Sequence, residues 1–394
     1  MRRRKSRRKD RRRSPLAARV GRIERTKLWL LIGIVAAAAV GVVQGVRYWM
    51  GTRSPQGQVI RVGAILPQTG PGAVFAQYIE EGIELAVEEV NGQGHPQVEV
   101  LYEDSKNQPK EGVTVYNKLV STDNPPVVIV ALSSVAKAVA PLAAQSKTAQ
   151  VYIAVAIPDI TDGRYTFRVY PEALGMAGVM ARFNATRLNA KSSAIIYLND
   201  DFGRVSQDAY TKEFESLGGR IVFAESYELQ QTDFRSQISK LKSVDPAPDV
   251  IYLNGYGPSY GAVVKQLREQ DVSPRLTADM TMGLPSTLEQ VGDAADGVYF
   301  VDGKMAQDFI ERFKHRYGKE PSSYAGYAYD IIKIIHKVAK ERGASTADGV
   351  SEGLRGIKDY QGAMGNVTIK QDGDSNLQFA VRRIIGQRIE TVPE

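Results

Sequence analysis

The sequence predicts an α/β protein of two doubly wound, Rossmann-like lobes, preceded by one transmembrane helix. Short apolar strands alternate with amphipathic helical stretches from residue 59 onward. This pattern is typical of parallel sheets that are covered on both faces. The alternation runs through two successive sets of similar size, which predicts two lobes. A single long apolar segment near the amino terminus predicts the membrane helix.

The first set of elements begins at residue 59. We expect strands at 59–66, 98–102, 127–132 and 151–155, and helices at 72–90, 109–120 and 133–146. In the first helix, Ile79, Ile83 and Val90 share one apolar stripe at helical spacing. That stripe is expected to pack against the sheet.

The second set repeats the pattern and is followed by a different ending. We expect strands at 193–198, 220–227 and 250–253, and helices at 203–217, 232–242, 258–270, 304–317 and 323–342. Residues 367–370 and 377–385 flank the turn 371–376, which predicts a hairpin. Tyr324 lies in a helix with two further tyrosines, and we expect it to serve lobe packing rather than ligand contact.

Composition excludes several classes of protein. The chain has 394 residues, of which 43% are hydrophobic and 24% charged, which is a globular composition with length for about two domains. It contains no cysteine, which excludes a disulfide scaffold, a thiolate zinc site, a cysteine nucleophile and a lipid-modified cysteine anchor. Three widely separated histidines argue against a histidine-rich metal site.

The basic charge of the chain is confined to its amino terminus. Residues 1–27 contain 14 Lys or Arg and two acids, a net +12, so of the total of +7 the remaining residues carry −5. The mildly acidic remainder has no basic footprint for nucleic acid, and we expect no nucleic-acid partner.

Residues 28–46 form the apolar segment, in which Gln44 is the only polar side chain. A helix of this length spans about 28 Å, close to the roughly 30 Å hydrocarbon core of a bilayer. The positive-inside rule then keeps residues 1–27 as a basic cytoplasmic tail. We expect a single-pass signal anchor in the cell membrane, a linker at 47–58, and a carboxyl-terminal part that is periplasmic or extracellular. A cleaved signal peptide is the alternative.

Motifs that would indicate an enzyme are missing from the sequence. There is no G-x-x-x-x-G-K-[ST] loop, no G-x-G-x-x-G after a strand and no G-x-S-x-G elbow. Residues 372–376 resemble the start of a calcium loop, but Leu377 stands where glycine is needed and Arg383 where the bidentate glutamate belongs. We therefore interpret this segment as a turn and expect no metal and no cofactor.

Polar loops follow the expected strands at their carboxyl ends. They are residues 66–72, 133–134, 154–158, 200–203 and 254–258. In open α/β sheets, ligands bind at this edge. A serine at a helix amino terminus, such as Ser133, either caps the helix or helps to hold an anion.

A series of short motifs recurs in one order along residues 59–394. They are 62–71, 82–91, 131–134, 140–143, 167–168, 201–203, 233–234, 248–249, 292–297, 329–330 and 362–365. Their order and spacing resemble the branched-chain-amino-acid (leucine/isoleucine/valine-binding) type of periplasmic binding protein, the substrate-binding proteins of ABC transporters. Each motif is weak alone, and the resemblance depends on the whole series.

The resemblance implies two lobes that close over a ligand, with three hinge crossings near residues 167–171, 299–302 and 361–365. The lobes expected from it are 59–169 with 303–361 for lobe 1, and 170–300 with 364–394 for lobe 2. The implied partners are a small-molecule ligand and the permease and ATPase subunits of an ABC importer. We expect a monomer.

The resemblance also implies how a ligand would be held. Ser133 matches the serine that grips the ligand carboxylate in amino-acid-binding members. The hydroxyl of the neighbouring turn falls at Ala156, which leaves only its backbone N–H as a donor. The aromatic covers fall on Phe202 and Tyr256. The ligand-binding residues expected in this sequence are Gln68, Phe75, Ser133, Ser134, Val155, Ala156, Phe202, Tyr256, Asp279 and Met280.

One position departs from the family pattern. The carboxylate that binds the ligand ammonium falls on Met280, with Asp279 adjacent. An ammonium buried without a carboxylate partner is costly. If Asp279 does not reach the ligand, an uncharged, aromatic or carboxylate-only compound becomes the expected ligand.

The sequence therefore predicts an extracytoplasmic solute-binding receptor that does no chemistry on its ligand. The alternative is a ligand-sensing ectodomain that signals to a membrane partner. An amidase or esterase on the same scaffold is disfavoured, because no nucleophile–base set is recognisable.

Overall fold

The computed structural model describes residues 59–393 except 71, 344 and 387. The expected tail, membrane segment and linker, residues 1–58, lie outside the described residues. Within the described part of the chain, no helix combines the length and the apolar character needed to cross a membrane.

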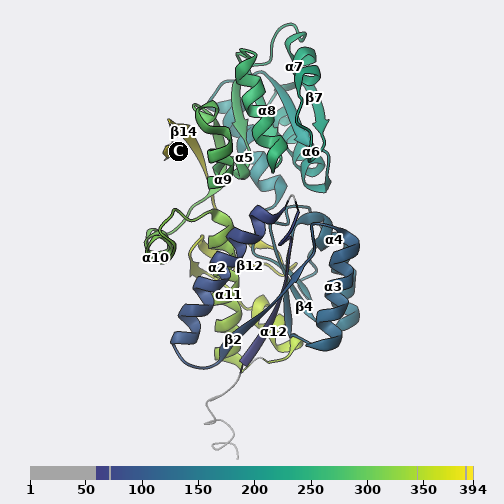
Figure 1. Cartoon of the computed structure of the whole chain (residues 1–394), viewed down its shortest axis with the longest axis vertical. Coiled ribbons are helices and arrows are strands. Elements are labelled where there is room, and N and C mark those ends of the chain that lie inside the picture. Colours follow the sequence, from purple (N-terminus) through teal and green to yellow (C-terminus); the bar gives the residue numbers. More distant parts are fainter. Residues whose placement is uncertain (1–58, 71, 344, 387, 394) are drawn as a thin grey trace, which may run out of the picture. The chain divides into compact units, whose positions relative to one another are not determined.

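Lobe 1 is built on a five-stranded parallel sheet (Figure 1). Its strand order is β2 (Gln97–Asp104), β1 (Val59–Leu66), β3 (Val127–Ala131), β4 (Ala149–Ile153) and β5 (Thr166–Arg168). Its helices are α2 (Ala73–Gly92), α3 (Pro109–Thr122), α4 (Ser133–Ser146), α10 (Gln307–Tyr317), α11 (Ser323–Arg342) and α12 (Ala347–Arg355). The expected helix at 323–342 is confirmed to the residue.

Side chains of the lobe 1 sheet are buried on both faces. Val62 and Ala64 share a core with α2 and α11, whereas Ile65 packs in a second core with Tyr116 and Val135 of α3 and α4. Successive residues of a strand point to opposite faces, so continuous apolar strands are what a sheet with two covered faces requires.

Lobe 2 is built on a seven-stranded sheet (Figure 1). Its order is β15 (Arg388–Thr391), β14 (Phe379–Ile385), β10 (Tyr299–Gly303), β9 (Arg275–Ala278), β8 (Val250–Asn254), β6 (Ser192–Leu198) and β7 (Arg220–Tyr227). Its helices are α5 (Ala173–Thr186), α6 (Asp201–Ser216), α7 (Arg235–Lys242), α8 (Pro258–Glu269) and α9 (Pro285–Val291), with 3₁₀ turns η1 (Met280–Gly283) and η2 (Gly292–Ala295). The strands from β10 to β7 are parallel, and β14 and β15 extend the sheet antiparallel.

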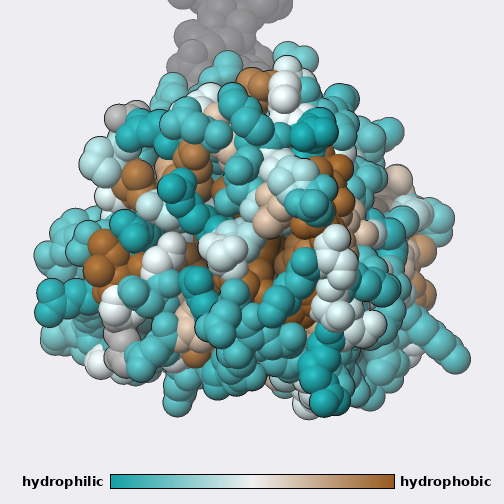
Figure 2. Space-filling view, turned by 90° about the horizontal axis from the view of Figure 1, so that it is seen from above, coloured by the Kyte–Doolittle hydropathy of each residue, from teal (hydrophilic) through white to brown (hydrophobic). Residues whose placement is uncertain are grey.

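The surface at the lobe 2 end is mostly hydrophilic. Figure 2 shows polar side chains over most of this face, with apolar side chains in smaller groups between them. Among the described residues, the exposed large hydrophobic side chains are Val59, Leu174, Leu217 and Ile385. Single exposed apolar side chains of this kind are normal on a globular surface.

The chain passes between the two sheets three times. It leaves lobe 1 after β5, returns after β10, and enters lobe 2 again between β13 (Ser375–Asn376) and β14. The third passage therefore lies at residues 377–378, and the expected position at 361–365 is wrong. Residues 362–365 instead form the turn between β11 (Tyr360–Gly362) and β12 (Gly365–Ile369).

The expected hairpin is correct in its turn and wrong in its second strand. Strand β12 pairs with the two residues of β13, while β14 pairs with β10 in the lobe 2 sheet. Residues 365–376 thus belong with lobe 1, although lobe 2 was expected from residue 364. Asp330 of α11 holds this segment to lobe 1, because its carboxylate accepts the N–H groups of Ala363 (2.6 Å) and Met364 (2.9 Å).

Arg168 lies fully buried where the chain first leaves lobe 1. Its Nε and Nη2 donate to the two oxygens of Asp374, at 2.7 and 2.5 Å, and Nη2 also donates to Glu172. Its Nη1 donates to the carbonyls of Val155 (3.2 Å) and Ile157 (2.6 Å). All five N–H donors of the guanidinium have acceptors, which is the condition for burying such a charge.

We expect Arg168→Met to lower the free energy of unfolding by about 3–5 kcal/mol, because it leaves Asp374 buried without its cation. Urea unfolding followed by circular dichroism measures this. Arg182→Met is the matched control, since Arg182 is half exposed and pairs with Glu213 at the surface. Its loss is expected to stay within about 1 kcal/mol. Equal losses in the two variants would contradict a structural role for the buried pair.

Stability is also expected to fall in acid through Asp374. Burial raises the pKa of Asp374, but the hydrogen bonds and charge of Arg168 outweigh burial and lower it below the ordinary 3.8. A carboxyl group with a lowered folded-state pKa stabilises the protein above its unfolded pKa and loses that contribution as the pH falls through the folded value. Between about pH 5 and pH 3, the wild type should therefore lose more stability than Asp374→Asn, measured by urea unfolding at each pH.

Candidate functional site

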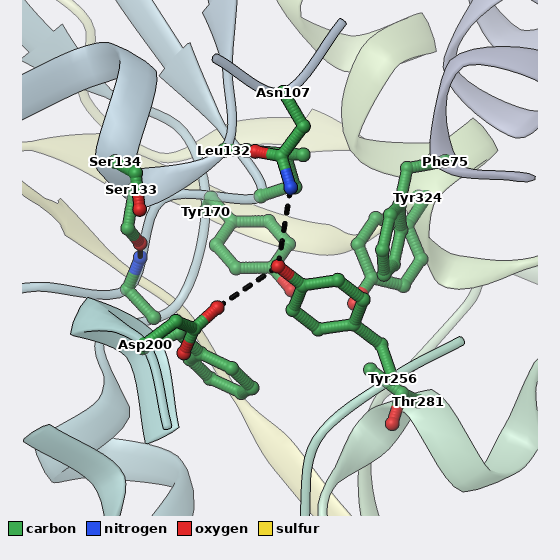
Figure 3. A pocket seen from close by; sticks show the side chains of 13 residues that line it. Phe75, Asn107, Leu132, Ser133, Ser134, Tyr170, Asp200, Tyr256, Thr281 and Tyr324 are labelled. Carbon is green, nitrogen blue, oxygen red and sulfur yellow. Dashed lines mark hydrogen bonds between the residues drawn. The ribbon is translucent and has the colours of Figure 1, made fainter. Parts of the chain in front are cut away.

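A cavity lies where the carboxyl ends of the two sheets meet, with walls from both lobes (Figure 3). The volume not occupied by atoms is about 380 Å³, and this figure includes the open mouth of the cavity. Its lining residues are Phe75, Asn107, Leu132, Ser133, Ser134, Ala154, Ala156, Tyr170, Asp200, Phe202, Tyr256, Thr281 and Tyr324. This is the edge at which open α/β sheets bind ligands.

The lobe 1 wall presents the amino terminus of α4. Ser133 is the first residue of this 14-residue helix, and its Oγ accepts the N–H of Ala156 at 3.2 Å. The Ser133 hydroxyl therefore keeps its proton for another acceptor. Ser134 lies next to it on the wall. Unpaired N–H groups and the helix dipole favour an anion at such a terminus.

Three residues of this wall have left-handed backbone conformations. Asn107, Leu132 and Ala154 have φ values of 56°, 71° and 55°. Such a conformation costs a residue other than glycine about 1–2 kcal/mol, and it persists only where the surrounding fold imposes it. Their concentration on one cavity wall points to a functional site.

The lobe 2 wall carries a carboxylate that is linked across the cavity. Asp200 caps α6, and its Oδ1 accepts the N–H of Gly203 at 2.7 Å. Its Oδ2 accepts the hydroxyl of Tyr256 at 2.8 Å, and that hydroxyl accepts from Asn107 of lobe 1 at 3.3 Å. Figure 3 shows this chain of two hydrogen bonds. Burial is the main cause that raises the pKa of Asp200.

Aromatic rings fill much of the remaining wall. Phe75 contacts Tyr256 edge-to-face at 5.1 Å between centroids and Tyr324 at 5.0 Å. Tyr324 in turn contacts Tyr170 at 5.7 Å. Rings from both lobes and from the first passage therefore meet at the cavity. Tyr324 is buried and packs against Phe75 and Tyr170, as expected for lobe packing, and it also lines this space.

Asp279 lies behind the wall rather than on it. Its carboxylate accepts the N–H groups of Gly255 and Thr281, both at 2.8 Å, and contacts the Thr281 hydroxyl. Burial is the main cause that raises its pKa to about 7. Met280 is also buried, with its sulfur accepting the hydroxyl of Tyr170 at 3.0 Å. The residue of this turn that faces the cavity is Thr281.

The structure brings six of the ten expected residues to the cavity wall, namely Phe75, Ser133, Ser134, Ala156, Phe202 and Tyr256. Gln68 is exposed and donates to Glu80, and the carbonyl of Val155 accepts from Arg168. The sequence reasoning missed Asn107, Leu132, Ala154, Tyr170, Asp200, Thr281 and Tyr324. The loop 200–203 had been recognised as polar, which was the available signal for Asp200.

Among the described residues that line the cavity, Asp200 is the one with a charged side chain. This described lining includes no Lys or Arg. The described residues also include no cluster of His, Asp or Glu that could hold a metal ion. The arrangement provides anion-binding N–H groups on one wall, a carboxylate on the other and rings between them. It is suited to binding a small polar molecule.

Comparison with known proteins gives one consistent result. A family model described as periplasmic binding protein matches residues 59–387. The chain is 24% identical over 329 residues to Leu/Ile/Val-binding protein homolog 1 of Brucella abortus (strain 2308), covering 81% of this chain and 88% of the relative. It is 25% identical over 335 residues to the leucine-, isoleucine-, valine-, threonine-, and alanine-binding protein of Pseudomonas aeruginosa, covering 82% and 89%.

Solved structures show the same type I periplasmic binding fold. A leucine-binding protein from Thermotoga maritima has a TM-score of 0.79 at 24% identity, covering 85% of this chain and 98% of that chain. A solute-binding protein of an ABC transporter from Rhodopseudomonas palustris BisB5, in complex with 3,4-dihydroxybenzoic acid, has a TM-score of 0.73 at 23% identity, covering 82% and 93%. Proteins with this fold thus include one named for leucine, which has an ammonium group, and one in complex with 3,4-dihydroxybenzoic acid, which has none.

We expect Asp279→Ala to destabilise the fold by about 2 kcal/mol or more, because it leaves two buried N–H groups without an acceptor. Thermal and urea unfolding measure the loss. Asp201→Ala is the control, since Asp201 pairs with Lys137 and Arg204 at the surface. Its effect should remain within about 1 kcal/mol. Wild-type stability in Asp279→Ala would show that this carboxylate is not structural.

Proposed function

This chain belongs to the periplasmic binding protein family, and from that premise we propose that it is the extracytoplasmic solute-binding receptor of an ABC importer. It closes its two lobes over a small polar ligand such as an amino acid or a related amide or carboxylate. The family consists of solute-binding receptors and not of enzymes, so the receptor releases its ligand unchanged.

The observation that carries this proposal is a cavity whose walls come from two lobes joined by only three passages of chain. A ligand in such a cavity touches both walls at once. It therefore favours the closed arrangement over an open one, in which each wall faces water. Hinge closure around a ligand is an established response in two-lobed proteins.

The proposed contacts divide between the lobes. The hydroxyls of Ser133 and Ser134 and the N–H of Ala156 would receive the ligand carboxylate at the start of α4. Phe202 and Tyr256 of lobe 2 would cover it, and Phe75 would support the Tyr256 ring. Gln68, Val155, Asp279 and Met280 would act indirectly, through the elements that they brace.

The proposed partners are the permease and ATPase subunits of the importer. Residues 28–46 would anchor the receptor in the membrane as a single-pass helix, and residues 1–27 would stay in the cytoplasm. A monomer is sufficient, since both walls of the cavity come from one chain.

The test is a thermal-shift screen of the full chain in detergent, after dialysis from denaturant to remove bound ligand. The compounds are leucine, isoleucine, valine, threonine, alanine, 3,4-dihydroxybenzoate and short amides. A ligand at 100 times its Kd stabilises the folded state by about 2.7 kcal/mol, which gives a readily measured shift. Titration calorimetry then gives the Kd of each compound that shifts the melting temperature.

Ser133→Ala is expected to weaken binding about tenfold, because it removes a hydroxyl from the carboxylate site. Ser216→Ala is the matched control, since Ser216 is exposed at the end of α6 and donates only to a carbonyl of its own helix. Turnover of any bound compound would contradict the receptor assignment. Ligand binding without transport by the assembled importer would favour a sensing role.

A further inference from the structure

Thr281 has one hydroxyl hydrogen, and two oxygen atoms compete for it. Its Oγ1 lies 2.5 Å from the carbonyl oxygen of Gly255 and also contacts Oδ1 of Asp279. A hydroxyl group donates one hydrogen bond. If Asp279 were ionised, one of these two contacts would join two oxygens without a hydrogen between them, which is unfavourable in a buried site.

A proton on Asp279 removes this conflict. A protonated carboxyl group carries one O–H donor, which would point to Oγ1 of Thr281. The hydrogen of the Thr281 hydroxyl would then go to the Gly255 carbonyl. The N–H groups of Gly255 and Thr281 keep their acceptors on Asp279, both at 2.8 Å, because each carboxyl oxygen retains a lone pair. Every contact of this cluster then contains one hydrogen.

The surroundings of Asp279 also favour its neutral form. The side chain is 1% exposed, and burial is the main cause that raises its pKa to about 7. The groups that lower this pKa are uncharged donors, namely the N–H groups of Gly255 and Thr281 and the hydroxyls of Thr281 and Tyr260. Neutral donors offset the cost of burying a charge less than a paired cation would.

Five tyrosines face Asp279 from the surrounding elements. They are Tyr170 after β5, Tyr227 of β7, Tyr252 of β8, Tyr260 of α8 and Tyr324 of α11. Burial is the main cause that raises the pKa of each phenol above its ordinary value, so all five stay neutral near pH 7. Two further acids act on the same rings, Asp200 on Tyr227 and Asp302 on Tyr170 and Tyr324.

Gly255 is the point at which this cluster reaches the cavity wall. Its φ is 152°, and a Cβ at this position would lie 1.8 Å from the hydroxyl oxygen of Tyr227, so the position requires glycine. The cluster holds its N–H through Asp279 and its carbonyl through Thr281. The next residue is Tyr256, whose ring lines the cavity (Figure 3). The bonds on both sides of this glycine therefore fix the place of the ring.

We propose that Asp279 is a pH-sensitive positioning residue, whose proton completes the bonds through Thr281 to Gly255 that hold Tyr256 in its ligand-binding position. When the proton leaves to the solvent, the Thr281 hydroxyl turns to the charged carboxylate and the Gly255 carbonyl loses its donor. Tyr256 is then held less firmly against the ligand, and affinity falls as the pH rises. The effect on binding rests on the function proposed above.

The first test measures the Kd of leucine and of valine between pH 6 and pH 8, by titration calorimetry on the full chain in detergent. Both amino acids keep the same charges over this range. If only the form with protonated Asp279 is competent to bind, a pKa of about 7 predicts that the Kd rises about tenfold from pH 6 to pH 8. A Kd that is constant, or that falls as the pH rises, would overturn the inference.

Asp279→Asn should remove this pH dependence, because the amide does not ionise while its NH₂ group can still donate to Thr281. One backbone N–H loses its acceptor, so the variant is expected to be less stable but folded, which thermal unfolding checks. Thr281→Val keeps both backbone bonds of Asp279 and gives the same test without that loss. It should bind more weakly at pH 6 and vary less than about threefold up to pH 8. Wild-type pH dependence in either folded variant would contradict the proposal.

Asp302→Asn and Asp200→Asn are the matched controls. Each removes a largely buried acid whose pKa is raised by burial and which shares a tyrosine neighbour with Asp279. Both variants should keep the roughly tenfold change between pH 6 and pH 8, whatever their affinity at pH 6. Loss of the pH dependence in one of them, with Asp279→Asn unaffected, would assign the titration to that acid instead.

Infrared spectroscopy tests the proton without any ligand. The difference between the spectra of the wild type and Asp279→Asn separates Asp279 from Asp330, whose pKa burial also raises to about 7. It should contain the carbonyl stretch of a protonated carboxyl group at pH 6, which weakens as the pH rises through about 7. Absence of this band at pH 6 would overturn the inference and leave the proposed function intact. With the band present, failure of leucine and valine to bind at any pH would overturn the amino-acid part of the proposed function and the effect of Asp279 on it.

Discussion

The arrangement of the two lobes depends on one buried cation, the guanidinium of Arg168, which joins two of the three passages of chain between the lobes. Arg168 ends the last strand of the lobe 1 sheet and is completely enclosed. It binds Asp374, which is more than 200 residues away in the sequence, together with two carbonyls of the loop after β4. Its own N–H donates to the carbonyl of Gly373 at 2.9 Å. The first and third passages between the lobes are thereby held together.

This constraint extends to the cavity. The carbonyls that Arg168 binds belong to Val155 and Ile157, on either side of Ala156. The N–H of Ala156 is thus aimed at Ser133 by a turn that is fixed from behind. The left-handed conformation of Ala154, with φ of 55°, persists in the same turn. A strained loop beside a ligand site needs such support, because its preferred conformation in isolation would differ.

The alternation of strands and helices was predictable because burial of both sheet faces imposes a continuous apolar pattern on every strand. The lobe 1 wall was equally predictable, since Ser133 and Ala156 lie within three residues of the ends of β3 and β4. The position of the third passage was not predictable from the sequence. Residues 365–385 contain two strand-forming stretches around a turn, and nothing local shows that the two strands join different sheets. The pairing of β14 with β10 separates the two stretches, and it is a contact between distant segments.

Asp200 and Asp279 show the same limit at the site. Both follow strands of lobe 2, and both begin a helical turn. The sequence provides no reason to prefer one over the other, and the family pattern places the ligand-binding carboxylate at Met280, with Asp279 adjacent. The difference arises from Gly255 and Thr281, whose N–H groups draw the Asp279 carboxylate away from the cavity. Asp200 has one N–H to cap, which leaves its second oxygen for Tyr256.

Near the cavity, the contacts between the lobes include polar pairs beside the ring contact of Phe75 with Tyr256. Asn107 donates to Tyr256 at 3.3 Å, and the N–H of Ser286 donates to the hydroxyl of Tyr78 at 3.1 Å. The salt bridge between Lys137 and Asp201 is largely exposed, and such pairs contribute about 0–1 kcal/mol. In the function proposed above, a ligand that bonds to both walls would add the free energy that favours the closed arrangement.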